Sequence, residues 1–177
     1  LCFYYCSKVA MHVRRGDVDE HNKHYLDDNY FIDMVARIRA LGFDVDAHVF
    51  SSTEKFCRPV NATMEACERE GRVVTRPATA FKGFRDRRMA LHLDGDTHVA
   101  WSHFIRADVF VMSPSAFSNV PAFLNGQCVV WVESQWTQLR LAHWIDADDL
   151  SSAQPLNVCL LGGVNGGGRS HSKNAYH

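Results

Sequence analysis

Two adjacent arginines, Arg14 and Arg15, are the residues of this chain that most clearly indicate chemistry. They belong to residues 12–17, which directly follow the apolar residues 9–11. A guanidinium is planar, keeps its charge and donates in a fork that fits phosphate oxygens. Gly16 lets the backbone turn tightly and Asp17 can form a salt bridge that orients an arginine. Because strand side chains alternate, we expect one arginine to grip a diphosphate while its neighbour holds the loop. Two solvated surface arginines are the alternative.

A second group of polar residues follows the apolar residues 109–112. Hydroxyls beside the free N–H groups of a helix start favour an anion. Pro121 fits best in the first turn of a helix, so Ser118 is the predicted N-cap, and Ser115 and Phe117 are predicted to lie in a loop facing the ligand. A Ser-capped helix without a ligand is the alternative.

Residues 12–17, HVRRGD, resemble the HxRRxD signature of the fucosyltransferases that use GDP-fucose, a superfamily with α-1,2-, α-1,6- and some protein-O-fucosyltransferases. Residues 107–118, ADVFVMSPSAFS, resemble the later strand-and-loop motif that this superfamily places beside the nucleotide. The resemblance implies inverting transfer of fucose from GDP-fucose to a glycan or glycoprotein acceptor. The alternative is a non-catalytic module that binds a nucleotide sugar or a glycan.

The resemblance also implies roles for individual residues. It implies that both arginines matter for the donor, that they stabilise the departing GDP, and that no metal cofactor is needed. His12 is implied to lie beside guanine, with a hydrogen-bonded core histidine as the alternative. Inverting transfer needs a base, for which Glu20 is the leading candidate and Asp19 the second, unless both are solvated loop charges. The predicted catalytic residues are Arg14, Arg15 and Glu20, and the predicted donor-binding residues are His12, Arg14, Arg15, Asp17, Ser115, Phe117 and Ser118.

One position departs from the pattern of the superfamily. The second motif begins with the pair Ala107-Asp108. Some relatives carry an acidic residue eight positions before this aspartate, where this chain has Ala100. Recognition of guanine by that carboxylate is therefore in doubt. Asp96 could take its place, although capping the following helix is its simpler role.

The elements that must position these residues follow from apolar periodicity. It predicts strands at residues 8–13, 47–50, 73–75, 109–112 and 127–131, helices at 29–41, 62–70 and 96–107, and a long loop at 76–95. Strands that alternate with helices predict right-handed crossovers and an α/β, Rossmann-like, mainly parallel sheet flanked by helices, with ligands at the carboxyl ends of the strands. This resembles the nucleotide-binding half of a GT-B glycosyltransferase.

The composition is typical of one globular domain. The 177 residues are 46% hydrophobic and 22% charged, and the net charge of −1 argues against a nucleic-acid surface. No apolar run is long enough to cross a membrane, so we expect no membrane contact within this segment. Residues 1–161 are predicted to form a nucleotide-sugar-binding domain that is part of a larger enzyme, and residues 162–177, rich in Gly, Asn and Ser, a disordered tail.

The six cysteines lack the CxxC spacing of a structural zinc site, although a few can form disulfides. Cys128 lies in an apolar strand and is predicted to be a buried small hydrophobic residue. Cys57 and Cys67 flank a glycosylation sequon at Asn61, which indicates the lumen of the secretory pathway, and the resemblance suggests the Golgi.

Histidines and tryptophans carry weaker signals. His98 and His103 are five residues apart, which is the wrong spacing for two metal ligands on one helix face, so they and His92 are interpreted as scattered surface histidines. Trp131, Trp136 and Trp144 are interpreted as packing residues, with an acceptor subsite as the alternative.

Overall fold

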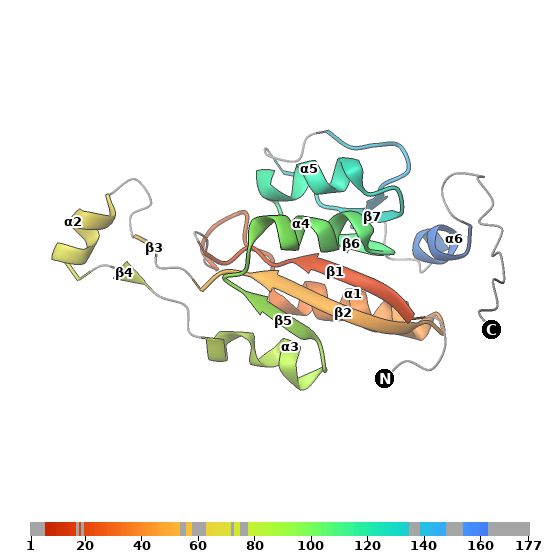
Figure 1. Ribbon diagram of the computed structural model, residues 1–177, viewed down its shortest axis with the longest axis horizontal. Helices are drawn as coiled ribbons and strands as arrows, with labels where there is room; N and C mark the ends of the chain where they lie inside the picture. Colours follow the sequence, from red (N-terminus) through yellow and green to blue (C-terminus); the bar gives the residue numbers. More distant parts are fainter. Residues whose placement is uncertain are drawn as a thin grey trace, which may run out of the picture.

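The computed structural model describes residues 6–162 except 17, 19, 54–55, 58–62, 72, 75–77, 135–138 and 148–153. Its main sheet has six strands, all parallel, in the spatial order β5-β2-β1-β6-β7-β8 (Figure 1). Numbered along the chain within this sheet, the order is 3-2-1-4-5-6, the arrangement of the Rossmann fold. The predicted α/β, Rossmann-like class is therefore confirmed. The strands are β1 (Cys6–His12), β2 (Asp44–Ser51), β5 (Ala90–Leu93), β6 (Val109–Val111), β7 (Cys128–Trp131) and β8 (Ile145–Asp146).

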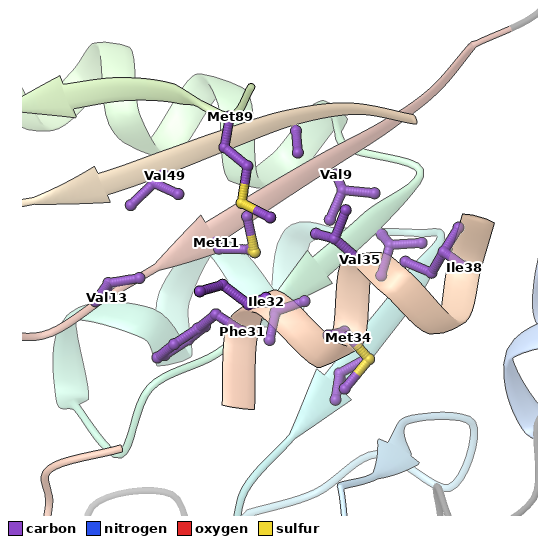
Figure 2. Close-up of a cluster of buried hydrophobic side chains, with 14 of the residues drawn as sticks. Val9, Met11, Val13, Phe31, Ile32, Met34, Val35, Ile38, Val49 and Met89 are labelled. Carbon is purple, nitrogen blue, oxygen red and sulfur yellow. The ribbon is translucent and has the colours of Figure 1, made fainter. Parts of the chain in front are cut away.

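Helices cover both faces of this sheet. Val9 and Met11 of β1 enter one hydrophobic core, with α1 (Asp28–Ala40) and α3 (Lys82–Asp86), whereas Ala10 enters a second core with α4 (Thr97–Arg106) and α5 (Ala116–Leu124). This alternation follows from the two-residue period of a strand, and because both faces are buried the strands read as continuous apolar runs. Figure 2 shows the first core between α1 and the strands.

The helix α1 forms as its sequence predicts. The Asp27 side chain caps it by accepting a hydrogen bond from Asn29 N at 2.8 Å. Its buried stripe at Phe31, Met34, Val35 and Ile38 has helical spacing. The chain leaves the helix at Gly42, whose φ of +89° is a conformation that glycine adopts without steric cost.

The prediction of a long loop at residues 76–95 was wrong. This segment holds the 3₁₀ turn η1 (Ala78–Phe81), α3 and β5, and it is anchored by the buried rings of Phe81 and Phe84. The strand β5 pairs with β2 and so takes the place in the main sheet that residues 73–75 were expected to fill. Four half-exposed residues in an Arg- and Gly-rich stretch give too short a pattern for the periodicity to reveal.

The strand at residue 73 belongs to a separate unit between β2 and η1. There β4 (Val73–Val74) pairs antiparallel with β3 (Phe56–Cys57), beside α2 (Met64–Arg69). Figure 1 shows this unit projecting from the main sheet. The α2 helix begins at its Thr63 cap, within the predicted range 62–70.

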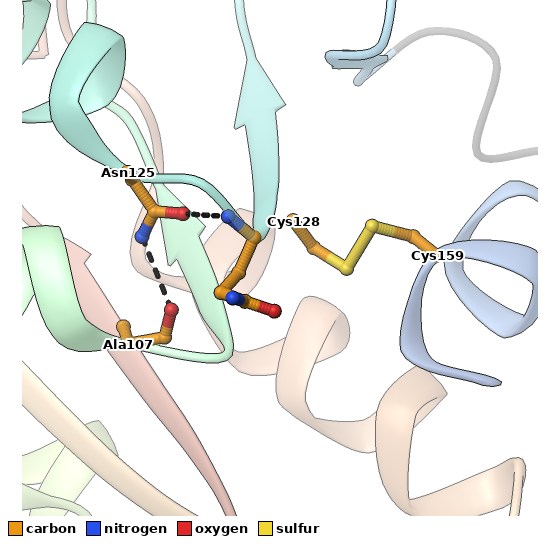
Figure 3. The surroundings of a disulfide bond; sticks show 5 residues. Ala107, Asn125, Cys128 and Cys159 are labelled. Atoms are coloured by element: carbon orange, nitrogen blue, oxygen red, sulfur yellow. Dashed lines mark hydrogen bonds between the residues drawn. A yellow bond between two sulfur atoms is a disulfide. The ribbon is translucent and has the colours of Figure 1, made fainter. Parts of the chain in front are cut away.

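The last helix, α6 (Gln154–Gly162), is tied to the sheet by a disulfide between Cys128 of β7 and Cys159 (Figure 3). Cys128 is buried as predicted, at 2% exposure, but its sulfur is in a disulfide, and burial alone does not reveal a partner that is 31 residues away. Gly162 ends α6, and residues 163–177 of the predicted tail lie outside the described residues. Within the described part of the chain, no helix has the length and apolar character to span a membrane.

Candidate functional site

A cleft of about 450 Å³ opens at the carboxyl ends of the parallel strands. The neighbouring strands β1 and β6 lie where the strand order of the sheet reverses, which is where open α/β sheets bind ligands. The cleft is lined by the end of β1 with its following loop, by the ends of β2 and β5, and by the starts of α4 and α5. Both predicted motifs therefore contribute to one cavity.

Direct hydrogen bonds join the two motifs. The backbone N–H of Arg14 donates to Ser113 Oγ at 3.1 Å, and that hydroxyl in turn donates to the carbonyl of His12. His12 Nδ1 lies 2.6 Å from Ser118 Oγ. The Arg14 guanidinium donates to the carbonyl of Pro114 at 3.0 Å. These contacts fix the loop after β1 against the loop after β6, although about a hundred residues separate them in the chain.

The two arginines have different surroundings. Arg15 is only 2% exposed, forms an ion pair with Asp28, donates to the carbonyl of Leu26 at 2.7 Å and lies 4.1 Å above the ring of Tyr25. Its guanidinium therefore holds the loop to the start of α1. Arg14 is half-buried. Both arginines line the cleft, but the guanidinium of Arg15 is held by the contacts within the loop.

The start of α5 differs from the prediction that Ser118 is the cap. Ser115 is the N-cap and accepts a hydrogen bond from Phe117 N at 3.3 Å, while Ser118 lies inside the helix, fully buried against His12. Pro121 also lies inside the helix. The contact of Ser118 with His12 of β1 favours a helix that starts at Ser115, three residues earlier than predicted. The prediction rested on the position of Pro121 alone, which does not reveal a contact with a distant strand.

Ser115 and Phe117 both line the cleft as predicted, but from the start of α5 rather than from a loop, since Ser115 is its N-cap and Phe117 lies in its first turn. The N-terminus of α5 therefore faces the cavity beside Arg14. Helix N-termini carry partial positive charge, so this corner of the cleft combines two features that attract an anion.

The predicted base Glu20 lies away from the cleft. Its side chain is 77% exposed and lies beside His21, with 3.9 Å between Glu20 Oε1 and His21 Nε2, and Glu20 is not among the residues that line the cleft. The other acidic residues of this loop, Asp17 and Asp19, lie outside the described residues. The structure therefore supports the alternative that Glu20 is a solvated loop charge.

Asp94 brings a carboxylate to the cleft that the sequence did not suggest. It accepts hydrogen bonds from Ser52 Oγ at 2.9 Å, from Thr53 N at 2.7 Å and from the Thr53 hydroxyl. The Thr53 hydroxyl is the main cause that holds the pKa of Asp94 below its usual value. A carboxylate stabilised in its charged form is a weaker base. Among the described residues that line the cleft, Asp94 is the one carboxylate.

The part of the cleft near α4 is aromatic and lacks an acidic group from this helix. Phe50, His92 and Ala100 line it. Asp96 instead caps α4 by accepting hydrogen bonds from His98 N and Val99 N, which is the simpler role predicted for it. Nothing in the local sequence marked Phe50 or His92 as cleft residues, because they come from the ends of β2 and β5, and β5 was not predicted.

The interpretation of the histidines as scattered was wrong for two of the three. His92 and His103 lie together with His48, whereas His98 is exposed. The His98–His103 spacing did not show this, because the partners come from β2 and β5. In the described ranges, no group of three or more His, Cys, Asp or Glu side chains is arranged to hold a metal ion.

Two of the three tryptophans pack in the interior. Trp131 and Trp144 are buried in the core under α4 and α5, as the packing interpretation predicts, and Trp136 lies outside the described residues.

The lining of the cleft suits a planar, anionic ligand. Arg14 and the start of α5 attract negative charge, and the aromatic residues Phe50, His92 and Phe117 line the same cavity. Comparison with known proteins adds no assignment, since the chain matches no family model, no curated protein and no solved structure.

Proposed function

We propose that the protein binds a nucleotide sugar of the GDP-fucose type in this cleft and transfers fucose, with inversion, to a glycan or glycoprotein acceptor. One observation carries the proposal. The HVRRGD segment at the end of β1 and the SPSAFS segment at the start of α5 are hydrogen-bonded to each other at the point where the sheet reverses its strand order. Both segments that resemble the fucosyltransferase motifs thus contribute to a single cleft.

In this proposal Arg14 and the N-terminus of α5 bind the diphosphate and stabilise the charge that develops on GDP as the sugar departs. Arg15 acts as a positioning residue, because its contacts with Asp28 and Leu26 fix the backbone from which Arg14 projects. Aromatic contact with the nucleobase is supplied by the half-buried Phe117, which lines the same cavity.

A second candidate function is a non-catalytic module that binds a nucleotide sugar or a glycan. The exposed position of Glu20 and the hydrogen-bonded state of Asp94 favour it, since neither is a suitable base for an acceptor hydroxyl. In that case the donor binds without turnover.

The disulfides support a location in the secretory pathway. Cys128 is joined to Cys159, and Cys6 and Cys67 are also in disulfides. Disulfides persist in oxidising compartments. We therefore extend the proposal to the lumen of that pathway, with the Golgi as the expected site.

Calorimetric titration with GDP tests the binding site. Removing a charged donor to phosphate costs about 1.5–3 kcal/mol, so Arg14→Ala is expected to weaken GDP binding about 10- to 150-fold. Arg85→Ala removes an exposed arginine of α3 on the other side of the sheet and is expected to leave GDP binding unchanged. Equal effects of the two substitutions, or no GDP binding by the wild-type protein, would contradict the proposed site.

Release of GDP from GDP-fucose in the presence of mixed glycan acceptors separates the two candidate functions. Release that is lost in Arg14→Ala supports the transferase, whereas tight GDP-fucose binding without release supports the module. GDP-mannose and UDP sugars serve as competing donors. Equal affinity for all of these donors would mean that the cleft recognises only the diphosphate and would contradict the proposed preference for GDP-fucose.

A further inference from the structure

Three histidines from three elements meet at the edge of the main sheet, and we call them the histidine cluster: His48 on β2, His92 on β5 and His103 on α4. Their ring centroids are 5.1 Å (His48–His92), 5.3 Å (His48–His103) and 5.5 Å (His92–His103) apart. All three are half-buried. The ring of Phe50 stacks on His92 with 4.4 Å between centroids and lies 5.0 Å from His103, so the rings form one packed group.

The contacts within the histidine cluster limit how many protons it can hold. His48 Nδ1 lies 2.9 Å from His92 Nε2, and His48 Nε2 lies 3.2 Å from Asp46 Oδ2. A protonated His48 can donate to both partners, but His92 Nε2 must then accept and remain unprotonated. A proton on His92 Nε2 as well would place two N–H groups against each other and replace the hydrogen bond with repulsion.

The charged groups around the histidine cluster do not relieve this repulsion. Lys8 of β1 and Arg106 of α4 line a second cavity of about 290 Å³ together with His48, His103 and Asp46. Among the described residues that line this cavity, Asp46 is the one carboxylate. Two permanent positive charges therefore oppose further protonation and one negative charge favours it.

Burial, followed by the positive charge of a protonated His48, lowers the pKa of both His92 and His103. The charge on His103 adds to the effect at His92, and Lys8 adds to it at His103, against an opposite effect of Asp46. These directions agree with the geometry of the contacts.

The histidine cluster connects β5 to the rest of the molecule. β5 is an edge strand, and β2 is its one strand neighbour. His92 lies opposite Phe50 in the register, and two residues later Asp94 holds Ser52 and Thr53 at the cleft. Movement of β5 away from β2 and α4 would therefore move one wall of the cleft.

We propose that the histidine cluster is an acid-sensitive latch: with at most one proton it holds β5 against β2 and α4, and further protonation releases β5 and opens that wall of the cleft. The proposal does not depend on which ligand the cleft binds. It predicts a response to pH that belongs to one edge of the sheet rather than to the whole fold.

The sign of the effect follows from the lowered pKa values. When β5 is released, His92 leaves the histidine cluster and regains an ordinary pKa near 6.5, so above this pH it is neutral in either state and the latch is at full strength. As the pH falls below 6.5, the released state binds protons that the latched state does not. The equilibrium constant for release then rises up to about tenfold per pH unit for each such proton.

Hydrogen exchange, corrected for the intrinsic rate at each pH, tests the latch in the intact chain. Between pH 7.5 and 5.5 we expect the opening constant of the β5 amides to rise about tenfold or more, and that of the central β6 amides to change much less. His103→Gln removes one imidazole from the cluster at a residue that does not itself line the main cleft, and should reduce the rise, because the charge of His103 adds to the effects that lower the pKa of His92. His98→Gln, an exposed change on the same helix, should follow the wild type.

Either of two results would overturn the latch. One is an equal rise in opening at β5 and β6 that His103→Gln does not alter. The other comes from NMR titration of the wild-type imidazole resonances and needs no variant. If His92 and His103 both titrate at or above pH 6.5, the cluster does not resist protonation and the latch does not exist.

Discussion

Arg15 illustrates how a charged residue becomes part of a core. Its guanidinium is enclosed by the Asp28 carboxylate, the Tyr25 ring and two carbonyls, those of Leu26 and Arg14. Each contact belongs to the chain between β1 and α1, so together they fix the path of that loop. A planar donor with five N–H groups can satisfy this many partners at once, and a lysine cannot.

We therefore expect Arg15→Ala to destabilise the fold. The substitution leaves two carbonyls and the Asp28 carboxylate without their donor, and such losses cost about 2–4 kcal/mol. Urea denaturation followed by circular dichroism measures the free energy of unfolding. Arg14→Ala, at a half-buried neighbour that lines the cleft, should lower it by less than half as much. Equal losses at the two positions would contradict the division of roles described above.

Among the elements, α5 and its neighbours are joined by one buried amide. Asn125, which follows α5 and is 2% exposed, donates from Nδ2 to the carbonyls of Phe104 at 2.6 Å and Ala107 at 3.1 Å. Its Oδ1 accepts from Gln127 N at 2.7 Å (Figure 3). A single side chain thus satisfies backbone groups at the end of α4, before β6 and before β7.

Asn125→Ala is expected to lower the free energy of unfolding by about 2–4 kcal/mol, because three hydrogen bonds are lost and the partner groups at this buried site lose their contacts. Thermal and urea denaturation both report this change. Asn29→Ala, at an exposed position of α1, is the matched control and should stay within about 0.5 kcal/mol. A small effect at Asn125 would mean that water replaces the amide.

The sequence allowed the prediction of those elements whose pattern is local. The stripe of α1 and the cap of α4 at Asp96 each lie within one segment, and both are confirmed. The strand β5 and the start of α5 at Ser115 could not be predicted in the same way. The first depends on pairing with β2, and the second on the contact of Ser118 with His12.

For the whole molecule, the disulfide between Cys128 and Cys159 joins the last helix to the sheet. Closing a loop of about 30 residues restricts the unfolded chain and stabilises the fold by about 3–4 kcal/mol in the chain-entropy account. Replacing both cysteines by alanine should lower the free energy of unfolding by about this amount, as measured in urea. A change below about 1 kcal/mol would contradict it.

The same double substitution should leave binding at the cleft unchanged. Cys128 is the first residue of β7, whereas the cleft lies at the opposite, carboxyl ends of the parallel strands. A calorimetric titration with GDP provides the check. Loss of binding in the variant without loss of folded protein would mean that α6 influences the cleft.

The candidate site could be predicted only as far as its two motifs. Arg14, Ser115 and Phe117 stood out because their residue types and their places after apolar strands indicate an anion site, and all three line the cleft. The remaining wall, formed by Phe50, His92 and Asp94, could not be predicted, because it comes from the β2 and β5 edge.

The central place of β1 has a consequence for how the chain acquires its structure during translation. β1 pairs on one side with β2, about 40 residues later, and on the other with β6, about 100 residues later. Until residue 111 has left the ribosome, one edge of this apolar strand has no partner, and loop closure over that distance is slow. A nascent chain therefore carries an adhesive edge until β6 has been synthesised, and shielding of that edge by a chaperone should increase the yield of native protein.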